Sequence, residues 1–145
     1  MRAIVVGCGR VGSTVAKTLA EEGWDVTAVD ESESALARLG ERWRGGFVIG
    51  HGMDLATLRQ AGIEDADAFI AVTNGDNRNI MAAQVARLIF EVPVVVCRIY
   101  DPVREDTYRR LGLTTVCPTT TISAIILDQV MRAASDADVV RGGTT

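Results

Sequence analysis

Six short apolar runs, rich in β-branched residues and separated by segments of helical spacing, constrain the fold of this chain more than any other feature. The runs are Ala3–Val6, Val26–Val29, Phe47–Ile49, Ala68–Val72, Val92–Cys97 and Thr114–Cys117. Near-continuous apolar strands are typical of parallel sheets buried on both faces, and each parallel connection needs a crossover, usually a helix. The sequence therefore predicts an α/β fold with a doubly wound, parallel, six-stranded sheet.

The first apolar run leads directly into a glycine-rich turn that opens a segment of helical spacing. This turn, Gly7-Cys8-Gly9-Arg10-Val11-Gly12, has the pattern G-x-G-x-x-G. The first glycine permits a tight bend, the second lets a pyrophosphate approach the backbone, and the third lets the helix pack closely on the sheet. Free N–H groups at the helix N-terminus favour an anion. The turn predicts a Rossmann-like dinucleotide-binding domain, and a purely structural glycine turn is the alternative.

The second apolar run ends at a pair of acidic residues. Asp30 lies where a carboxylate can accept hydrogen bonds from both hydroxyls of an adenosine ribose, and Glu31 follows it as a further candidate binding residue. A carboxylate at this position repels a 2′-phosphate, and residues 31–34 include no Arg or Lys. The sequence thus favours NAD over NADP. The alternative role of Asp30 is to cap the helix that is expected to start near Ser32.

Polar residues and glycines also follow the third, fourth and fifth runs. They are Gly50 and His51, Thr73 and Asn74, and Arg98. Because open α/β sheets bind ligands at the carboxyl ends of their strands, we expect these residues to line the nucleotide site, with His51 beside the adenine ring. The alternatives are a loop histidine without function, a helix cap supplied by Asp76 or Asn77, and a structural ion pair of Arg98.

Two side chains of the glycine-rich turn carry further chemistry. The Arg10 guanidinium is placed to contact a phosphate of the same nucleotide or of one held by a neighbouring subunit, unless it is a solvated surface arginine. Cys8 lies near a helix N-terminus, which is expected to lower the pKa of its thiol, although we expect no redox role. The cysteines Cys8, Cys97 and Cys117 lack CxxC spacing, which favours reduced thiols over a disulfide framework or a zinc site.

Charge and missing motifs exclude several function classes. The net charge of −4 argues against binding of a nucleic-acid backbone. No apolar run approaches the roughly 20 residues that cross a bilayer, and the N-terminus does not resemble a signal peptide, so we expect a cytoplasmic protein. The sequence has no HExxH, GxSxG or Walker lysine, and its only histidine lies on the adenine side of the predicted site. We therefore expect no enzymatic activity.

Many of these motifs occur together in one family. The residues that carry the likeness are Gly7 to Gly12, Val29-Asp30, Gly50-His51-Gly52, Leu58 to Ile63, Ala66-Asp67, Val72-Thr73, Asp76, Asn79, Arg98, Asp101-Pro102, Leu111-Gly112 and Cys117-Pro118. Over about residues 1–134 the chain resembles the N-terminal nucleotide-binding domain of TrkA-type potassium-uptake regulators, also called the RCK or KTN domain. This resemblance divides the chain into an RCK N-terminal domain of residues 1–134 and a polar C-terminal tail of residues 135–145.

The resemblance implies a function as a cytoplasmic ligand sensor that binds NAD(H) or ATP/ADP and assembles into a homodimer or a larger ring. Its partner would be a separate integral-membrane potassium-transporting subunit, of the TrkH, TrkG or KtrB type, which it would gate from the inner face of the cell membrane. Gly-His at residues 50 and 51 is similar to the NAD-type branch, so NAD(H) is expected ahead of ATP or ADP. The alternative is a small NAD-dependent oxidoreductase or an NADH-sensing redox regulator.

The resemblance also implies roles for individual residues. Gly7, Gly9, Arg10 and Gly12 match the family's phosphate loop, Asp30 matches its ribose carboxylate, and His51, Thr73 and Arg98 match its other nucleotide-facing positions. Thr119 departs from the pattern, because many relatives have an acidic residue there, which some use near a divalent cation. We therefore expect no metal site.

The stretch Thr119–Ala134 has apolar residues on two nearly opposite helical faces. One face contains Ile122, Ile125, Ile126, Val130 and Ala133, and the other contains Ala124, Leu127, Met131 and Ala134. A helix that covers a sheet needs only one buried face, so we expect the second to pack against another subunit. The smallest stable unit would then be a homodimer. The alternative is that the tail after Ser135 covers the second face.

Overall fold

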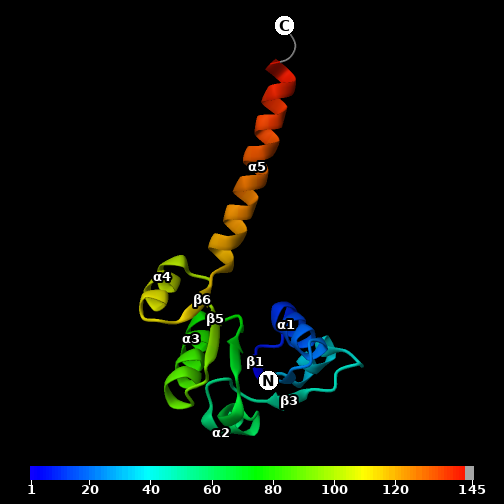
Figure 1. The fold of residues 1–145 in the computed structure, drawn as a ribbon, viewed down its shortest axis with the longest axis vertical. Helices are drawn as coiled ribbons and strands as arrows, with labels where there is room; N and C mark the ends of the chain where they lie inside the picture. The colour runs from blue at the N-terminus through cyan, green and yellow to red at the C-terminus, as the bar shows by residue number, and fades with distance from the viewer. Residues whose placement is uncertain (143–145) are drawn as a thin grey trace.

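A computed structural model describes residues 1–142. At the centre of the fold is one parallel sheet of six strands in the order β3-β2-β1-β4-β5-β6 (Figure 1). The strands are β1 (Arg2–Val6), β2 (Asp25–Asp30), β3 (Gly46–Ile49), β4 (Ala68–Ala71), β5 (Val94–Arg98) and β6 (Thr114–Val116). Each begins and ends within two residues of the apolar run that predicts it. The predicted doubly wound, Rossmann-like α/β fold is confirmed.

Helices connect the strands and cover both faces of the sheet. They are α1 (Arg10–Glu21), η1 (Glu33–Leu39), α2 (Leu55–Gln60), η2 (Ile63–Asp65), α3 (Asp76–Gln84), η3 (Val85–Ile89), α4 (Pro102–Arg110) and α5 (Pro118–Gly142). Two differ from the regular α-helices that the spacing suggests, because η1 is a 3-10 helix and α3 passes into a π-helical turn, η3. Both changes affect hydrogen bonding within the crossovers and leave the sheet order unchanged.

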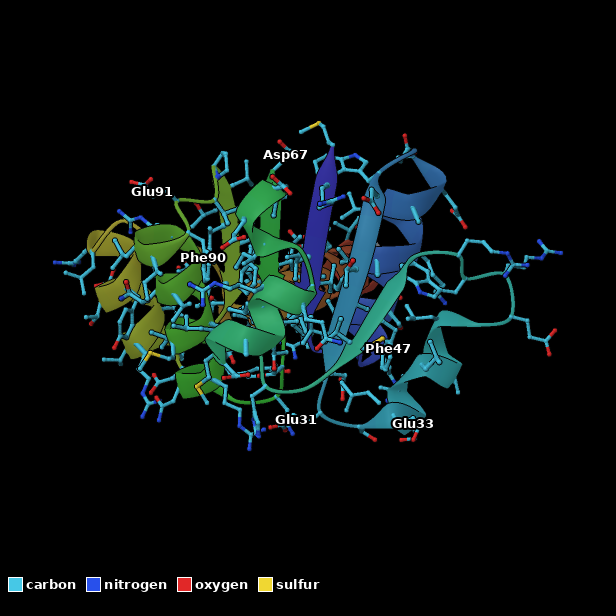
Figure 2. All side chains as sticks on the ribbon, turned by 90° about the horizontal axis from the view of Figure 1, so that it is seen from below. Glu31, Glu33, Phe47, Asp67, Phe90 and Glu91 are labelled. Carbon is cyan, nitrogen blue, oxygen red and sulfur yellow. The ribbon has the colours of Figure 1, made fainter. Side chains whose placement is uncertain are left out.

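The core lies on both sides of β1, and alternate residues of this strand face opposite layers. Ala3 and Val5 belong to a cluster with Ala16 of α1, whereas Ile4 belongs to a larger cluster with Leu58 of α2. These residues are fully buried. Figure 2 shows the sheet with helices packed on either side. Burial on both faces explains why the strands are near-continuous apolar runs and not alternating ones.

Helix α5 contradicts the prediction that one face of this helix packs on the sheet. It projects away from the sheet as one rod of 25 residues, with no buried side chain (Figure 1). Its attachment is local, since the Thr119 hydroxyl donates to the Tyr100 carbonyl at 2.7 Å and the Thr120 hydroxyl to the Cys117 carbonyl at 3.2 Å. Two apolar faces of comparable strength give the helix no single preferred side for the sheet.

Most of the predicted polar tail, residues 135–145, falls within the described part of the chain. Residues 135–142 continue α5, so they do not fold back over its second apolar face, and residues 143–145 lie outside the described part of the chain. Both apolar faces of α5 are therefore exposed in the single chain: Ile126 is 56% exposed and Met131 67%. Within residues 1–142, no helix is both long and apolar enough to cross a membrane.

Candidate functional site

A cavity of about 350 Å³ opens at the carboxyl ends of the central strands. It lies where β1 and β4 are neighbours and the strand order changes direction, which is the position at which open α/β sheets bind ligands. Of the predicted site residues, those that line it are Gly7, Gly9, Asp30, Glu31, Gly50, His51, Thr73, Asn74 and Arg98. Sequence reasoning thus brought most of its candidates to one place, and their binding roles stay predictions.

The glycine-rich turn has the geometry of a phosphate loop. Gly7 has a φ of +94°, and a Cβ atom there would lie 2.7 Å from the Thr73 nitrogen. A Cβ at Gly12 would lie 1.7 Å from the Gly7 carbonyl oxygen, so only glycine allows α1 to pack this closely. A Cβ at Gly9 would meet no atom within 4 Å. Gly9 lines the cavity, and the space beside it is open.

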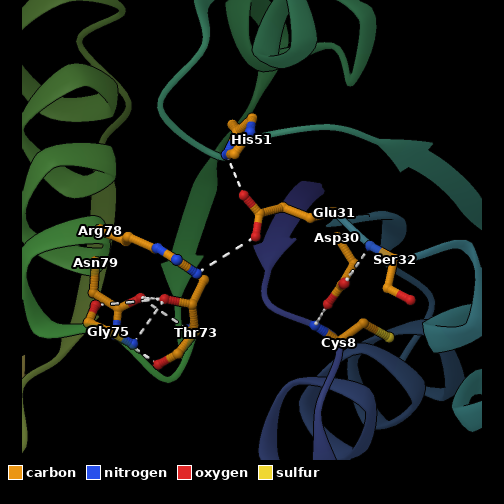
Figure 3. Close-up of polar contacts among 9 residues, drawn as sticks. All are labelled: Cys8, Asp30, Glu31, Ser32, His51, Thr73, Gly75, Arg78 and Asn79. Atoms are coloured by element: carbon orange, nitrogen blue, oxygen red, sulfur yellow. Dashed lines mark hydrogen bonds and ion pairs between the residues drawn. The ribbon is translucent and has the colours of Figure 1, made fainter.

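The Asp30 carboxylate is fixed by two backbone donors (Figure 3). Its Oδ2 accepts from the Cys8 N–H at 2.8 Å, and its Oδ1 accepts from the Ser32 N–H at 2.9 Å. The bond from Ser32 closes an Asx turn between residues 30 and 32. It is not the helix cap that was the alternative role of Asp30. Each carboxylate oxygen has a further lone pair, so Asp30 can still accept hydrogen bonds from ribose hydroxyls.

Four members of the glycine-rich turn do not line the cavity. They are Cys8, Arg10, Val11 and Gly12. Arg10 and Val11 are exposed on the first turn of α1, whereas the Cys8 thiol is buried and donates to the Ala35 carbonyl at 3.6 Å. The prediction of a lowered pKa for Cys8 is wrong. Desolvation by burial raises it, and the nearby Asp30 carboxylate adds to this effect.

A buried amide holds the loop after β4 against the end of β5. The Asn79 Oδ1 accepts from both the N–H and the hydroxyl of Thr73, at 2.8 and 2.7 Å. Its Nδ2 donates to the Thr73 and Arg98 carbonyls, each at 2.9 Å. Arg98 also joins the end of β5 to the segment after β4, because its Nη2 donates to the carbonyls of Val72 and Thr73. Arg98 therefore bonds to backbone carbonyls here and makes no ion pair among residues 1–142.

Helix α3 begins without the side-chain cap that the alternative interpretation assigned to Asp76 or Asn77. Its N-cap is Gly75, which makes no side-chain bond. The Asp76 carboxylate instead accepts from the N–H groups of Tyr100 and Asp101, at 2.7 and 3.1 Å. The first turn of α3 is thus tied to the segment that follows β5. This tie keeps the polar loop after β4 at the edge of the cavity.

Glu31 makes a bridge across the mouth of the cavity. Its carboxylate pairs with His51 Nδ1 on one side and with Arg78 Nη1, at 3.4 Å, on the other (Figure 3). Sequence reasoning placed Arg78 in the polar segment after the fourth strand without giving it a role of its own. It missed Arg38, which also lines the cavity but lies on η1, eight residues after Asp30. No local pattern indicates that η1 turns this side chain back toward the strand end.

The sequence pattern of the TrkA-N domain matches residues 3–119. The chain belongs to the TrkA-N family. It is 50% identical over 116 residues to the Trk system potassium uptake protein TrkA of Streptomyces coelicolor, covering 80% of this chain and 52% of that protein. This TrkA-N chain therefore spans about half the length of that relative.

Solved structures support the same fold assignment. GsuK bound to ADP superimposes with a TM-score of 0.73 and 26% identity, covering 92% of this chain and 34% of that chain. The GsuK channel bound to NAD gives a TM-score of 0.68 and 21% identity, covering 83% and 22%. TrkA-N domains of this type are regulatory and non-enzymatic, which agrees with the expectation drawn from the missing catalytic motifs.

The described residues hold no group of three metal-ligating side chains close enough to bind an ion. Thr119, which departs from the acidic residue of the family pattern, donates its hydroxyl to the Tyr100 carbonyl. What the cavity offers is the backbone of Gly7 and of Gly9, the N-cap of α1, together with a fixed carboxylate at Asp30 and guanidinium groups on its wall. These are the groups that bind a nucleotide's phosphates and sugar.

Proposed function

We propose that this chain is the nucleotide-binding regulatory domain of a potassium uptake system, with NAD(H) as its first ligand and ATP or ADP as the alternatives. The observation that carries the proposal is the open space at Gly9, directly over the N-terminus of α1 and beside the Asp30 carboxylate. One end of this arrangement suits a phosphate and the other a ribose. The cavity volume lies within the range of ligand sites, about 300–1,000 Å³.

Relatives with this fold support a nucleotide as the ligand. GsuK is described as bound to ADP in one structure and to NAD in another. By the same likeness, the domain acts from the cytoplasmic face of the membrane. There it binds an integral-membrane potassium-transporting subunit and changes its activity when the nucleotide binds.

The exposed helix α5 supports assembly with a second subunit. Large apolar side chains, including Ile122, Ile125, Leu127 and Met131, are all more than half exposed on it. A single soluble chain rarely leaves such a surface uncovered. We therefore propose that α5 packs against a second copy to form a homodimer, which is the smallest unit of a ring.

A thermal shift assay tests the ligand directly. A ligand at about 100 times its dissociation constant stabilises the native state by about 2.7 kcal/mol. For a chain of this size the melting temperature should rise by about 5–11 °C. NADH, NAD, ATP and ADP are the ligands to compare, and GTP is the control for base selectivity. If none of the adenine nucleotides raises the melting temperature, the proposed function is wrong.

A further inference from the structure

The Glu31 bridge joins three separate segments of the chain. Glu31 follows β2, His51 follows β3, and Arg78 lies on α3 after β4. Their side chains are between 43% and 63% exposed, so the bridge lies at the mouth of the cavity and not in the core. All three residues line the same cavity as the glycine-rich turn. The contacts are therefore made across the space that a ligand would enter.

Sheet order fixes what the bridge spans. In the order β3-β2-β1-β4, the segments after β2 and β4 lie on either side of the end of β1. The glycine-rich turn follows β1, so the contact between Glu31 and Arg78 passes over this turn. A nucleotide with its ribose at Asp30 and a phosphate at Gly9 would share one cavity with that contact.

The three guanidinium groups on the cavity wall differ in what they bind. Arg98 donates to two backbone carbonyls, and its guanidinium stacks on the Tyr100 ring at 4.8 Å, so it is held by the fold. Arg38 is exposed on η1, which follows β2, whereas Arg78 lies on α3, which follows β4. Arg78 is held by a half-exposed carboxylate at 3.4 Å. A contact of this kind is weak in water and easily exchanged for another anion.

We propose that Glu31 and Arg78 form an exchangeable latch, in which a phosphate of the bound nucleotide replaces the Glu31 carboxylate as the partner of Arg78. Guanidinium binds phosphate by paired, charge-assisted hydrogen bonds, which are stronger than an exposed ion pair. Glu31 thus acts as a competitor for the ligand, and Arg78 makes affinity depend on phosphate charge. This inference rests on the proposed function, because it takes an adenine nucleotide as the ligand.

Calorimetric titration of Glu31→Gln and Arg78→Gln with ADP and with adenosine tests the latch. Arg78→Gln should weaken ADP binding about tenfold and change adenosine binding less than twofold, because only ADP has phosphates. Glu31→Gln should strengthen ADP binding about threefold or more, since it removes the competing charge. Two variants serve as matched controls far from the cavity. Glu64→Gln removes the exposed ion pair with Arg59, and Arg110→Gln removes the one with Asp106.

The outcomes separate the latch from the proposed function. Wild-type protein that binds none of NADH, NAD, ATP and ADP refutes the proposed function and the latch with it. If the wild type binds ADP but Arg78→Gln does so within twofold of it, only the latch is wrong. Equal losses for ADP and adenosine in Arg78→Gln overturn the latch too, because they assign Arg78 to the base or ribose. Weaker ADP binding by Glu31→Gln also overturns it.

A crystal structure of the wild-type ADP complex gives a readout that does not depend on any variant folding. The latch predicts that the Arg78 guanidinium lies within hydrogen-bonding distance of a phosphate oxygen and away from Glu31. An ADP complex in which Arg78 is still paired with Glu31 refutes the exchange.

Discussion

Replacing Asn79 by alanine should destabilise the whole domain, because this one amide satisfies polar groups on two loops. Asn79 is fully buried, and its side chain makes four hydrogen bonds of 2.7–2.9 Å to Thr73 and Arg98. Its removal leaves the Thr73 N–H without a partner and leaves the Arg98 carbonyl only a long contact from the Cys97 thiol at 3.9 Å. The Thr73 carbonyl keeps a bond from Arg98 Nη2 at 2.9 Å. These two main-chain groups therefore account for most of the expected loss of stability.

Each orphaned buried group costs about 1–3 kcal/mol. Because Thr73 lines the cavity, water can reach part of the space left by the amide, so the lower half of that range applies. We expect a loss of about 2–4 kcal/mol in the free energy of unfolding, to be measured by urea denaturation. The melting temperature should fall by about 4–16 °C.

Asn77→Ala is a matched control on the same helix. Asn77 is exposed, and its side chain accepts one bond from Arg104 at 2.8 Å. Its removal should change stability by less than about 0.5 kcal/mol. Asn79→Asp should be at least as damaging as Asn79→Ala at neutral pH, because a carboxylate oxygen would then face the two carbonyls that the amide now donates to. Equal stability of the Asn77→Ala and Asn79→Ala proteins would refute this account of the loop.

Three further predictions concern the ligand site and the projecting helix. Gly9→Ala should fold normally, because its methyl meets open space, yet bind nucleotide at least about tenfold more weakly, whereas Gly12→Ala should lose stability in denaturation. Asp30→Asn should weaken NADH binding and reduce the difference in affinity between NADH and NADPH, measured by calorimetry. Wild-type protein that binds NADH and NADPH equally tightly contradicts the assignment of Asp30 to the ribose. Leu127→Glu combined with Met131→Lys should shift the assembly toward folded monomer in light scattering, and a wild-type monomer at micromolar concentration contradicts the dimer.

The fold was predictable because the central strands of the sheet are buried on both faces. A run such as Ala3–Val6 is apolar without a break, and it is found as β1 extended by one residue. The boundary error is larger at β5, which starts at Val94 although the apolar run starts at Val92. Val92 is buried in the turn before the strand, and its N–H donates to the Ala86 carbonyl at the π-helical turn. Hydrophobicity reports burial and does not distinguish a buried turn from a strand.

The site was predictable only where a residue sits at the end of a strand. Asp30 is the last residue of β2 and Thr73 follows β4 by two residues, so strand order alone brings them to the same edge of the sheet. The contact between Glu31 and Arg78 is different, since it joins residues 47 positions apart through side-chain directions that no local pattern encodes. Cys8 shows a related limit. Its place near a helix N-terminus suggested a lowered pKa, but burial dominates, and burial depends on η1 packing over the thiol.

Helix α5 shows that an amphipathic pattern predicts which faces of a helix need to be covered, but not which surfaces cover them. Two apolar faces require two covering surfaces, and the sequence predicted that the sheet covers one of these faces. In the structure the helix is held instead at its first turn, where Thr119 donates to the Tyr100 carbonyl. The Tyr100 N–H donates in turn to Asp76, in the same turn of α3 that contains Arg78. The cavity wall and the base of α5 therefore bond to one residue, Tyr100, which joins the first turn of α3 to the first turn of the projecting helix.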